Sequence, residues 1–391
     1  MIKREVDIMN AKGVLTKYAM TIATVIVIIF FTVATQGKLL FPQNVNNVIA
    51  QNAYVFVIAM GMLLCILTGG NIDLSVGSIV GLVGAVGAIL MVNHNVAIPV
   101  AMLVCLIIGT LIGAWQAYWI AYQRIPPFIT TLAGMYMWRG LSNVILQGLT
   151  ISPMPDAFNN IFNSYVPDFF GGNGFNITCF AVGIIICVAY IGAQLSARAK
   201  RIKKGYEAGS FSAMMAKTVI ICAVVIFFMY KLAKYQGIPV ILIWVAVIVL
   251  IYTYITSKTT TGRYFYAVGG NEAATEMSGI NTNKVYFIAY TNVAFLSSIA
   301  GFIIMARLNS ANPTAGTNYE MDAIASCFIG GASAYGGIGT TTGVVIGAIL
   351  MGVLNLGMSI MGVDMNWQRV VKGGVLLIAV IFDVVSKRKS S

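Results

Sequence analysis

Long apolar runs alternate with short polar segments along almost the whole chain. A run of about 20 apolar residues is long enough to cross the hydrocarbon core of a bilayer as an α-helix. We place eleven such runs, near residues 18–35, 49–68, 74–92, 96–122, 127–147, 174–194, 213–232, 237–256, 285–305, 341–362 and 366–384. The pattern predicts an all-α protein that passes through a membrane many times.

A further segment, residues 322–339, is rich in glycine and fits either a crossing or a re-entrant loop. Broken helices occur in membranes where the backbone is buried in protein or lines a cavity, and glycine permits them. With this segment as a crossing, the count is twelve and both chain ends lie on one side. We therefore expect one transmembrane domain over residues 1–391, embedded from 18 to 384, with about 10–12 transmembrane helices and broken or re-entrant segments.

The composition excludes a soluble globular protein. Of the 391 residues, 59% are hydrophobic and only 9% are charged, and the mean hydropathy is +0.86. A soluble domain of this size needs far more surface charge. The net charge of +12 does not indicate a nucleic-acid partner, because the basic residues gather in loops between apolar runs. The six cysteines lack the paired spacing of a metal or redox site, and we expect no disulfide.

The distribution of basic residues orients the predicted helices. Cytoplasmic loops of membrane proteins carry an excess of Lys and Arg. With the N-terminus inside, 17 of the 24 Lys and Arg residues fall in inside segments, beginning with Lys3, Arg4, Lys12 and Lys17. No small-residue cleavage pattern follows them, so the first run is interpreted as a retained helix. We expect both termini in the cytoplasm, together with a loop over residues 257–284.

Catalytic motifs are missing from the sequence. His94 is the single histidine, which excludes histidine-based triads and multi-histidine metal sites. Neither a GxxxxGK[ST] phosphate loop nor a GxSxG nucleophile motif occurs. We therefore expect a non-catalytic chain with no metal site.

A polar island over residues 262–281 interrupts the apolar pattern. Gly269 and Gly270 are expected to break the structure before them, because glycine has little penalty for a kinked or left-handed backbone. Asn271 fits the N-cap of a new helix, and Glu272 fits its first turn, where the helix dipole favours an anion.

Gly279 falls where a C′ glycine would end this helix. The island therefore predicts a helix of about two turns that lies outside the lipid. A membrane protein has no local need for such a helix unless a partner docks there.

Polar residues also lie between the second and third runs, in the segment Thr68–Gly77. Asp73 is flanked by long apolar stretches, and an acid at such depth is a functional hypothesis by default. Asn71 and Ser75 lie beside it. The alternative is a capped turn, in which Asp73 or Asn71 is the N-cap of the third run with support from Ser75. A translocation path or gate and a structural cap both stay open.

Thr130 and Thr131 follow Pro126 and Pro127 just inside the fifth run. The prolines suit an extended approach and the first turn of a helix. The two hydroxyls can bond to the backbone, which is the simpler interpretation, or to a polar solute in the same path.

A polar loop over residues 309–322 lies outside in this topology and ends with two acids, Glu320 and Asp322. We expect these acids to be exposed at the entrance to the glycine-rich segment. A soluble partner with basic residues could dock on them. The alternative is charge matching at the N-terminus of the next helix, which Asp322 would begin.

Several of these motifs occur together and in order in one protein family. The resemblance is carried by Gly70–Gly77, Gly262–Asn281, Pro313–Ala325 and Gly330–Gly339. On these motifs, the chain resembles the permease subunits of bacterial ABC importers for simple sugars, the ribose, xylose and galactose group. The resemblance covers most of the chain, and the ordered set of motifs makes it specific.

The resemblance implies an assembly in the bacterial cytoplasmic (inner) membrane. Its partners would be ABC ATPase subunits, an extracytoplasmic sugar-binding protein, a second permease copy in a homodimer, and membrane lipid. ATP and Mg would be held by the ATPase, and no cofactor by this chain. The ATPase would drive a coupling helix in the polar island. The expected coupling residues are Gly269, Gly270, Asn271, Glu272, Glu276 and Gly279.

Two features depart from the shorter members of this family. Three runs, near 174–194, 213–232 and 237–256, stand where shorter members have one, so residues 195–236 lie within an added helix pair. This longer form is similar to the xylose and multiple-monosaccharide branch and favours those sugars. Glu276 stands where related chains often carry a basic residue, which leaves charge pairing with the ATPase open.

A secondary transporter that works alone is the competing interpretation. It would need membrane-buried ionisable residues for ion coupling, and Asp73 is the only acid well placed for that role. A membrane scaffold without transport is a third interpretation, but it does not explain the glycine-rich broken segments. A requirement for ATPase, binding protein and ATP would exclude the lone transporter.

Overall fold

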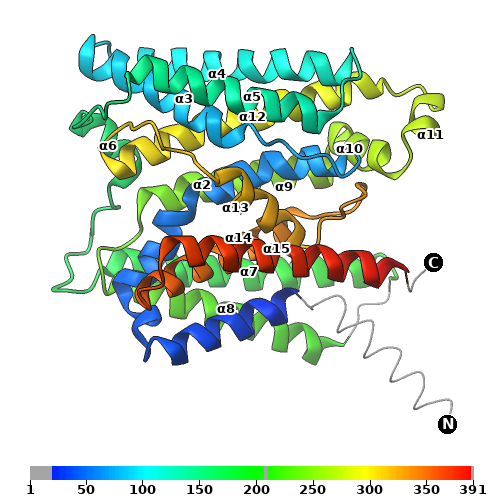
Figure 1. Cartoon of the computed structure of the whole chain (residues 1–391). Helices are drawn as coiled ribbons and strands as arrows, with labels where there is room; N and C mark the ends of the chain where they lie inside the picture. The colour runs from blue at the N-terminus through cyan, green and yellow to red at the C-terminus, as the bar shows by residue number, and fades with distance from the viewer. Residues whose placement is uncertain (1–19, 207–209, 389–391) are drawn as a thin grey trace.

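The computed structural model describes residues 20–206 and 210–388, which are almost entirely helical. The long helices lie side by side along one axis (Figure 1). Their bounds are Met20–Ala34, η1 Lys38–Leu40, α2 Pro42–Leu67, α3 Val76–Ala88 with its continuation η2 Ile89–Asn93, α4 Ile98–Ala121, α5 Pro127–Leu146, α6 Asp156–Asn163, α7 Ile177–Lys203, α8 Phe211–Ala233, α9 Val240–Lys258, α10 Thr260–Gly270, α11 Glu272–Met277, α12 Thr282–Leu308, α13 Tyr319–Ile329, α14 Thr341–Ile360 and α15 Met365–Arg388. Over these ranges the β pairings are two isolated bridges, and the predicted all-α class is confirmed.

Eight helices of the described ranges are long and apolar enough to cross a membrane. They are α2, α3 with its continuation, α4, α7, α8, α9, α12 and α14. The shorter helix Met20–Ala34 and the helices α5 and α15 stand outside this group, but each coincides with a predicted run. Every predicted run is therefore a helix in the structure, and the chain is a multi-pass membrane protein.

The apolar helices differ in what covers them. The most apolar stretch of α2 is 89% buried inside the protein, whereas that of α8 is only 6% buried. α2 therefore forms the centre, in contact with α9, α12, α13 and α14. α7 and α8 pack on each other at the edge (Figure 1). A helix that is apolar on all sides and uncovered by protein fits a lipid-facing position.

The glycine-rich segment is a half-helix followed by extended chain. α13 has 11 residues, about 16 Å at 1.5 Å per residue, and is too short to cross alone. It begins after the loop that follows the C-terminus of α12. The chain beyond it reaches the opposite end of the bundle, where the carbonyl of Gly339 accepts from Tyr266 of α10. The segment therefore runs from within the bundle to its α10 end, and its second half is not helical.

The two ends of the bundle carry different structures (Figure 1). α10 and α11 lie at one end, on the right in the view, and α6 lies at the other. α15 ends at the α11 end, whereas the helix from Met20 begins near the middle of the view. The N-terminal cations Lys3, Arg4, Lys12 and Lys17 lie outside the described residues.

Two local expectations were incomplete. The predicted run ends near residue 194, but α7 continues through the basic residues up to Lys203. Basic residues in the last turn complement the negative end of the helix dipole, and this favours the extension. The amphipathic helix α10, directly before the predicted coupling helix, was also missed.

Candidate functional site

α11 has the local structure that its sequence predicts. The side chain of Asn271 accepts a hydrogen bond from the amide of Ala274 at 2.9 Å, as an N-cap does. Glu272 lies in the first turn. Gly279 has a φ of 83° and follows the C-cap residue, so the predicted C′ glycine is confirmed.

The outer surface of α11 is open to a partner. Glu276 is exposed, and Met277 is 84% exposed. Thr275 faces inward and is buried. α11 thus presents an acid and a large apolar side chain on its outer face, while its inner face packs against the protein.

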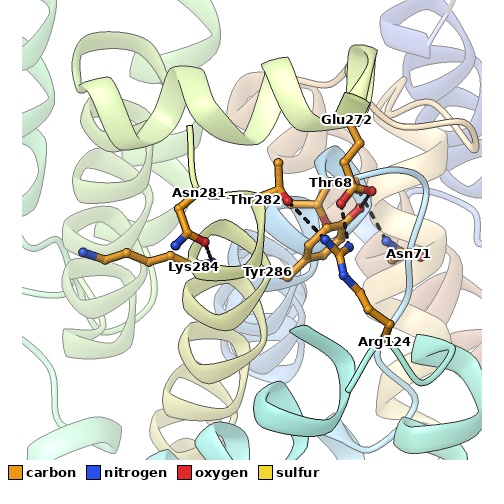
Figure 2. Close-up of polar contacts among 8 residues, drawn as sticks. All are labelled: Thr68, Asn71, Arg124, Glu272, Asn281, Thr282, Lys284 and Tyr286. Carbon is orange, nitrogen blue, oxygen red and sulfur yellow. Dashed lines mark hydrogen bonds and ion pairs between the residues drawn. The ribbon is translucent and has the colours of Figure 1, made fainter. Parts of the chain in front are cut away.

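Glu272 ties α11 to the transmembrane helices (Figure 2). Arg124, in the loop between α4 and α5, donates to its carboxylate at 2.6 Å. The hydroxyl of Tyr286 on α12 donates to the second carboxylate oxygen at 3.0 Å. Arg124 also donates to the Thr282 hydroxyl at 3.2 Å. In Figure 2, Lys284 points away from this group. Three elements distant in sequence therefore meet at one carboxylate.

The charge state of Glu272 follows from these partners. Partial burial alone would raise the pKa of its carboxyl group. Hydrogen bonds from Arg124 and Tyr286, together with the Arg124 charge, outweigh that effect and hold the pKa below its usual value. The carboxylate is therefore ionised at neutral pH.

α10 ends at Gly270, so the predicted break lies at this glycine pair. Neither glycine has a positive φ, so a left-handed backbone is not its cause. The importance of Gly269 lies in close packing instead. A Cβ there would lie 1.8 Å from the Leu67 carbonyl oxygen and 2.4 Å from the Gly337 amide nitrogen. Gly270 has no atom within 4 Å of such a Cβ.

α10 therefore touches both broken segments of the protein at once. Gly337 donates a backbone hydrogen bond to Leu67 at 3.0 Å, which joins the extended chain after α13 to the end of α2. Tyr266 of α10 donates to Gly339 at 2.9 Å. A displacement of α10 would press directly on these segments.

Asp73 lies in the irregular chain between α2 and α3 and is fully buried. Its Oδ1 accepts from the Ser75 amide at 2.8 Å and from the Ser75 hydroxyl at 2.6 Å, as in an Asx turn. Ser75, which is the N-cap residue of α3, also bonds to Gln116 of α4. Neither Asp73 nor Asn71 is the N-cap, so this alternative is wrong in detail. Asp73 Oδ2 has no partner among the described residues.

Asn71 lies apart from that network. It lines a cavity of about 150 Å³ together with Arg124, Pro127 and Tyr286. Figure 2 shows it beside the Glu272 group, with its amide toward Thr68. The structure therefore brings one predicted path residue to the coupling region.

Thr130 and Thr131 are buried on α5. The Thr131 hydroxyl donates to the Pro127 carbonyl at 2.9 Å, and that of Thr130 to the Pro126 carbonyl at 3.4 Å. Both hydroxyls therefore bond to the backbone one turn earlier, which is the simpler interpretation given above.

Glu320 and Asp322 are buried, so the expected exposure of these acids is wrong. The two residues are 5% and 3% exposed. Asp322 accepts from the Tyr54 hydroxyl at 2.6 Å and pairs with Lys372 at 3.0 Å. Glu320 lies against α3, where a Cβ on Gly77 would be 2.3 Å from its carboxylate. Both acids stand in the first turn of α13, as the charge-matching alternative requires.

The sequence analysis did not identify the cations that pair with Glu272 and Asp322. Arg124 pairs with Glu272 across 148 residues, and Lys372 pairs with Asp322. A lysine within an apolar run was the available signal, because charged residues inside membranes are expected to be paired.

Comparison with known proteins gives one family and a consistent set of relatives. A family profile described as "Branched-chain amino acid transport system / permease component" matches residues 44–380. The xylose transport system permease protein XylH of Escherichia coli (strain K12) is 37% identical over 95% of this chain and 93% of its own. Its counterpart in Haemophilus influenzae is also 37% identical, over 95% and 97%.

A ribose protein extends this set. The ribose import permease protein RbsC of Escherichia coli (strain K12) is 36% identical over 87% of this chain and 85% of its own. No solved structure matches the chain.

Proposed function

The chain belongs to the permease family described as branched-chain amino acid transport system / permease component, and from this premise we propose that it is the membrane subunit of an ATP-driven importer for a monosaccharide. The observation that carries the proposal is 37% identity to a xylose permease over 95% of the chain. The resemblance identified from the motifs is thereby confirmed. The chain is a non-catalytic subunit, and xylose is the first sugar to test.

Permeases of such importers work with an ATPase and an extracytoplasmic sugar-binding protein, and we propose both as partners. The ATPase would hold ATP and Mg, while this chain binds no cofactor of its own. A second copy of the permease would complete a homodimer, and membrane lipid would cover the apolar surfaces of α7 and α8.

The ATPase contact is proposed at α11. Exposed Glu276 and Met277 would meet the ATPase, while Asn271 and Gly279 fix the ends of the helix. A push on α11 would move the Glu272 carboxylate and, through Arg124, the start of α5. It would also move α10 against the broken segments at Leu67.

The sugar path is proposed along these broken segments. Asn71 would lie at the α11 end of the path, and the Asp73–Ser75 turn deeper within it, supported by Gln116. Unsatisfied Asp73 Oδ2 offers a hydrogen-bond acceptor that a passing hydroxyl can use. Thr130 and Thr131 would shape the neighbouring start of α5, because their hydroxyls already have backbone partners.

We propose the α11 end as the cytoplasmic end, with both termini there, because basic residues gather on that side. The binding protein would then dock at the α6 end. Buried Glu320 and Asp322 would act on docking through the loop at 309–318, which Arg139 also holds by a 2.7 Å bond to Thr317.

The test is ATP hydrolysis by the permease reconstituted with the ATPase and binding protein of its own organism. We expect xylose-loaded binding protein to stimulate hydrolysis, and removal of the permease to abolish that stimulation. Galactose and ribose, each on its own binding protein if needed, complete the panel. A rate of ATP hydrolysis that depends neither on the permease nor on any loaded binding protein would contradict the proposal.

A further inference from the structure

A cavity of about 310 Å³ opens beside α13, between α2, α14 and α15. This volume is at the low end of the roughly 300–1,000 Å³ that is typical of small-molecule sites. Tyr54, which lines the cavity, lies 12 residues into α2, about 18 Å from its start at 1.5 Å per residue. The cavity is therefore part-way along a membrane-spanning helix and away from the site at α11.

An ion pair forms part of the cavity wall. The Lys372 ammonium lies 3.0 Å from Asp322 Oδ1 and 3.2 Å from Oδ2, and the Tyr54 hydroxyl donates to Oδ2 at 2.6 Å. The Asp322 side chain is 5% exposed, whereas that of Lys372 is 26% exposed. Charges inside a membrane protein are costly even when paired, so such a pair marks a function by default.

An aromatic wall stands next to this pair. The Tyr319 ring stacks on the Tyr54 ring, with centroids 3.8 Å apart and planes at 24°. The stack fixes Tyr54, whose hydroxyl in turn holds Asp322. Both tyrosines line the cavity and offer apolar ring carbons against which the C–H groups of a sugar ring can pack.

The charges of the pair cancel, but much of its bonding capacity is left. An ammonium has three donors and a carboxylate has about four acceptor sites, so both can bond a ligand while paired. Gln368 lines the same cavity and adds an amide. Charge-assisted hydrogen bonds from a pair whose own charges cancel suit a neutral ligand with several hydroxyls, while exposed Arg369 adds one cation to the cavity wall.

We propose that this cavity is an intermediate binding site for a neutral monosaccharide, whose hydroxyls bond to Asp322 and Lys372 and whose ring lies against the tyrosine stack. The inference rests on the proposed function, monosaccharide import. It adds the place in the permease where the sugar is held after its release from the binding protein.

The first test measures sugar binding to the purified permease in nanodiscs. Met321 lines the cavity and is 45% exposed, so a Met321→Cys variant reports on access to it. Met277→Cys on α11, where Met277 is 84% exposed, is the matched control. We expect D-xylose at ten times its dissociation constant to slow maleimide labelling of Met321→Cys about tenfold. Labelling of the control should not change.

Two results of this test would overturn the site. One is equal labelling of Met321→Cys with and without D-xylose, in a permease that still imports xylose within its complex. The other is stronger protection by the anion D-xylonate, because the site would then select charge rather than a neutral sugar. Arg369 is an exposed cation that lines the cavity. It could bind the carboxylate of D-xylonate, so the comparison separates binding of charge from binding of the neutral sugar.

The second test removes both charges together, as Asp322→Asn with Lys372→Gln, so that no unpaired charge stays buried. We expect the maximal uptake rate to fall about tenfold or more, as for lost hydrogen bonds to charged groups. ATPase binding should not change. Lys217→Gln, at an exposed lysine of α8, is the matched control.

An unchanged uptake rate in the double variant would overturn the site. If that variant does not assemble, the labelling test, which keeps the ion pair intact, still shows whether the cavity binds the sugar. Absence of ATP-dependent monosaccharide import in the wild-type complex would instead refute the proposed function. The two failures are therefore distinguishable.

Discussion

The carboxylate of Glu272 joins the helix outside the membrane to the helices inside it. It accepts from Arg124 and Tyr286, which belong to different elements. Coupling requires a physical connection with differential contacts in two states, and this carboxylate is the most direct connection between α11 and the transmembrane helices.

Glu272→Gln keeps the shape of the side chain and removes its charge. We expect sugar imported per ATP hydrolysed to fall about tenfold, because hydrogen bonds to charged groups contribute about 1.5–3 kcal/mol. Basal ATP hydrolysis should persist, since the outer face of α11 is intact. Both rates are measured in the same proteoliposomes.

The exchanged pair Arg124→Glu with Glu272→Arg is the control for this prediction. It should recover part of the coupling, because it restores the opposite charges. An unchanged ratio in Glu272→Gln would show that transmission does not pass through this carboxylate.

The same carboxylate gives a pH prediction. Its pKa is lower in the folded protein, so its ion pair stabilises the fold above the unfolded pKa, about 4.3, and this contribution is lost as pH falls through the folded value. We expect the Tm difference between wild type and Glu272→Gln to persist from neutral pH down to about pH 4.3. A difference that has already vanished at about pH 6 would contradict the lowered pKa.

Gly269 and its neighbour Gly270 form a matched pair of positions. A methyl group at Gly269 would collide with the backbone at Leu67, and overpacking typically costs about 1–3 kcal/mol. Gly269→Ala should therefore lower Tm and weaken coupling, whereas Gly270→Ala should do neither. Thermal unfolding and uptake of the two variants in parallel check this. Equal Tm values and equal uptake rates for the two variants would contradict a role for the close contact at Gly269.

At the scale of elements, α13 and α14 are held together by backbone contact. Gly343 and Gly347 are four residues apart on α14, the spacing of small residues at close helix pairs in membranes. A Cβ at Gly347 would lie 2.0 Å from the Ser326 carbonyl oxygen, and one at Gly343 2.0 Å from that of Gly330. The half-helix is thus fixed against a full helix.

This packing predicts the effect of a methyl group. Gly347→Ala should destabilise the permease by about 1–3 kcal/mol, while Gly374→Ala on α15 should not, because nothing lies within 4 Å of its Cβ. Thermal unfolding in nanodiscs measures both. A normal Tm for Gly347→Ala would mean that the two helices can separate without cost.

The elements that the sequence predicts well are those determined locally. Apolar length predicts the spans, and the caps of α11 depend on residues within a few positions of each other, Asn271 and Gly279. The ion pair of Arg124 with Glu272 joins residues 148 positions apart, which no local pattern can place.

The acids of α13 illustrate the same limit. Glu320 and Asp322 follow a polar loop, which suggested exposure. Their burial depends on how α13 enters between α2 and α3, and on Lys372 of α15 as a distant partner. Only the tertiary structure supplies these neighbours.

At the scale of the whole molecule, the two ends have separate tasks. We expect α11 on the cytoplasmic side and the loop before α7 outside. In spheroplasts, a membrane-impermeant maleimide should label Phe169→Cys, where Phe169 is 74% exposed. In cells that lack the ATPase, so that α11 is uncovered, Met277→Cys should react only after permeabilisation. The reverse pattern would invert the topology and separate α11 from any cytoplasmic ATPase.

The central claim is that ATP hydrolysis at the α11 end drives sugar through this chain. The most direct measurement is xylose uptake per ATP hydrolysed by the complete complex in proteoliposomes, with ATP supplied only at the α11 face. We expect uptake in proportion to hydrolysis, unchanged when proton and sodium gradients are collapsed. Uptake by the permease alone, driven by such a gradient without ATP, would contradict the account.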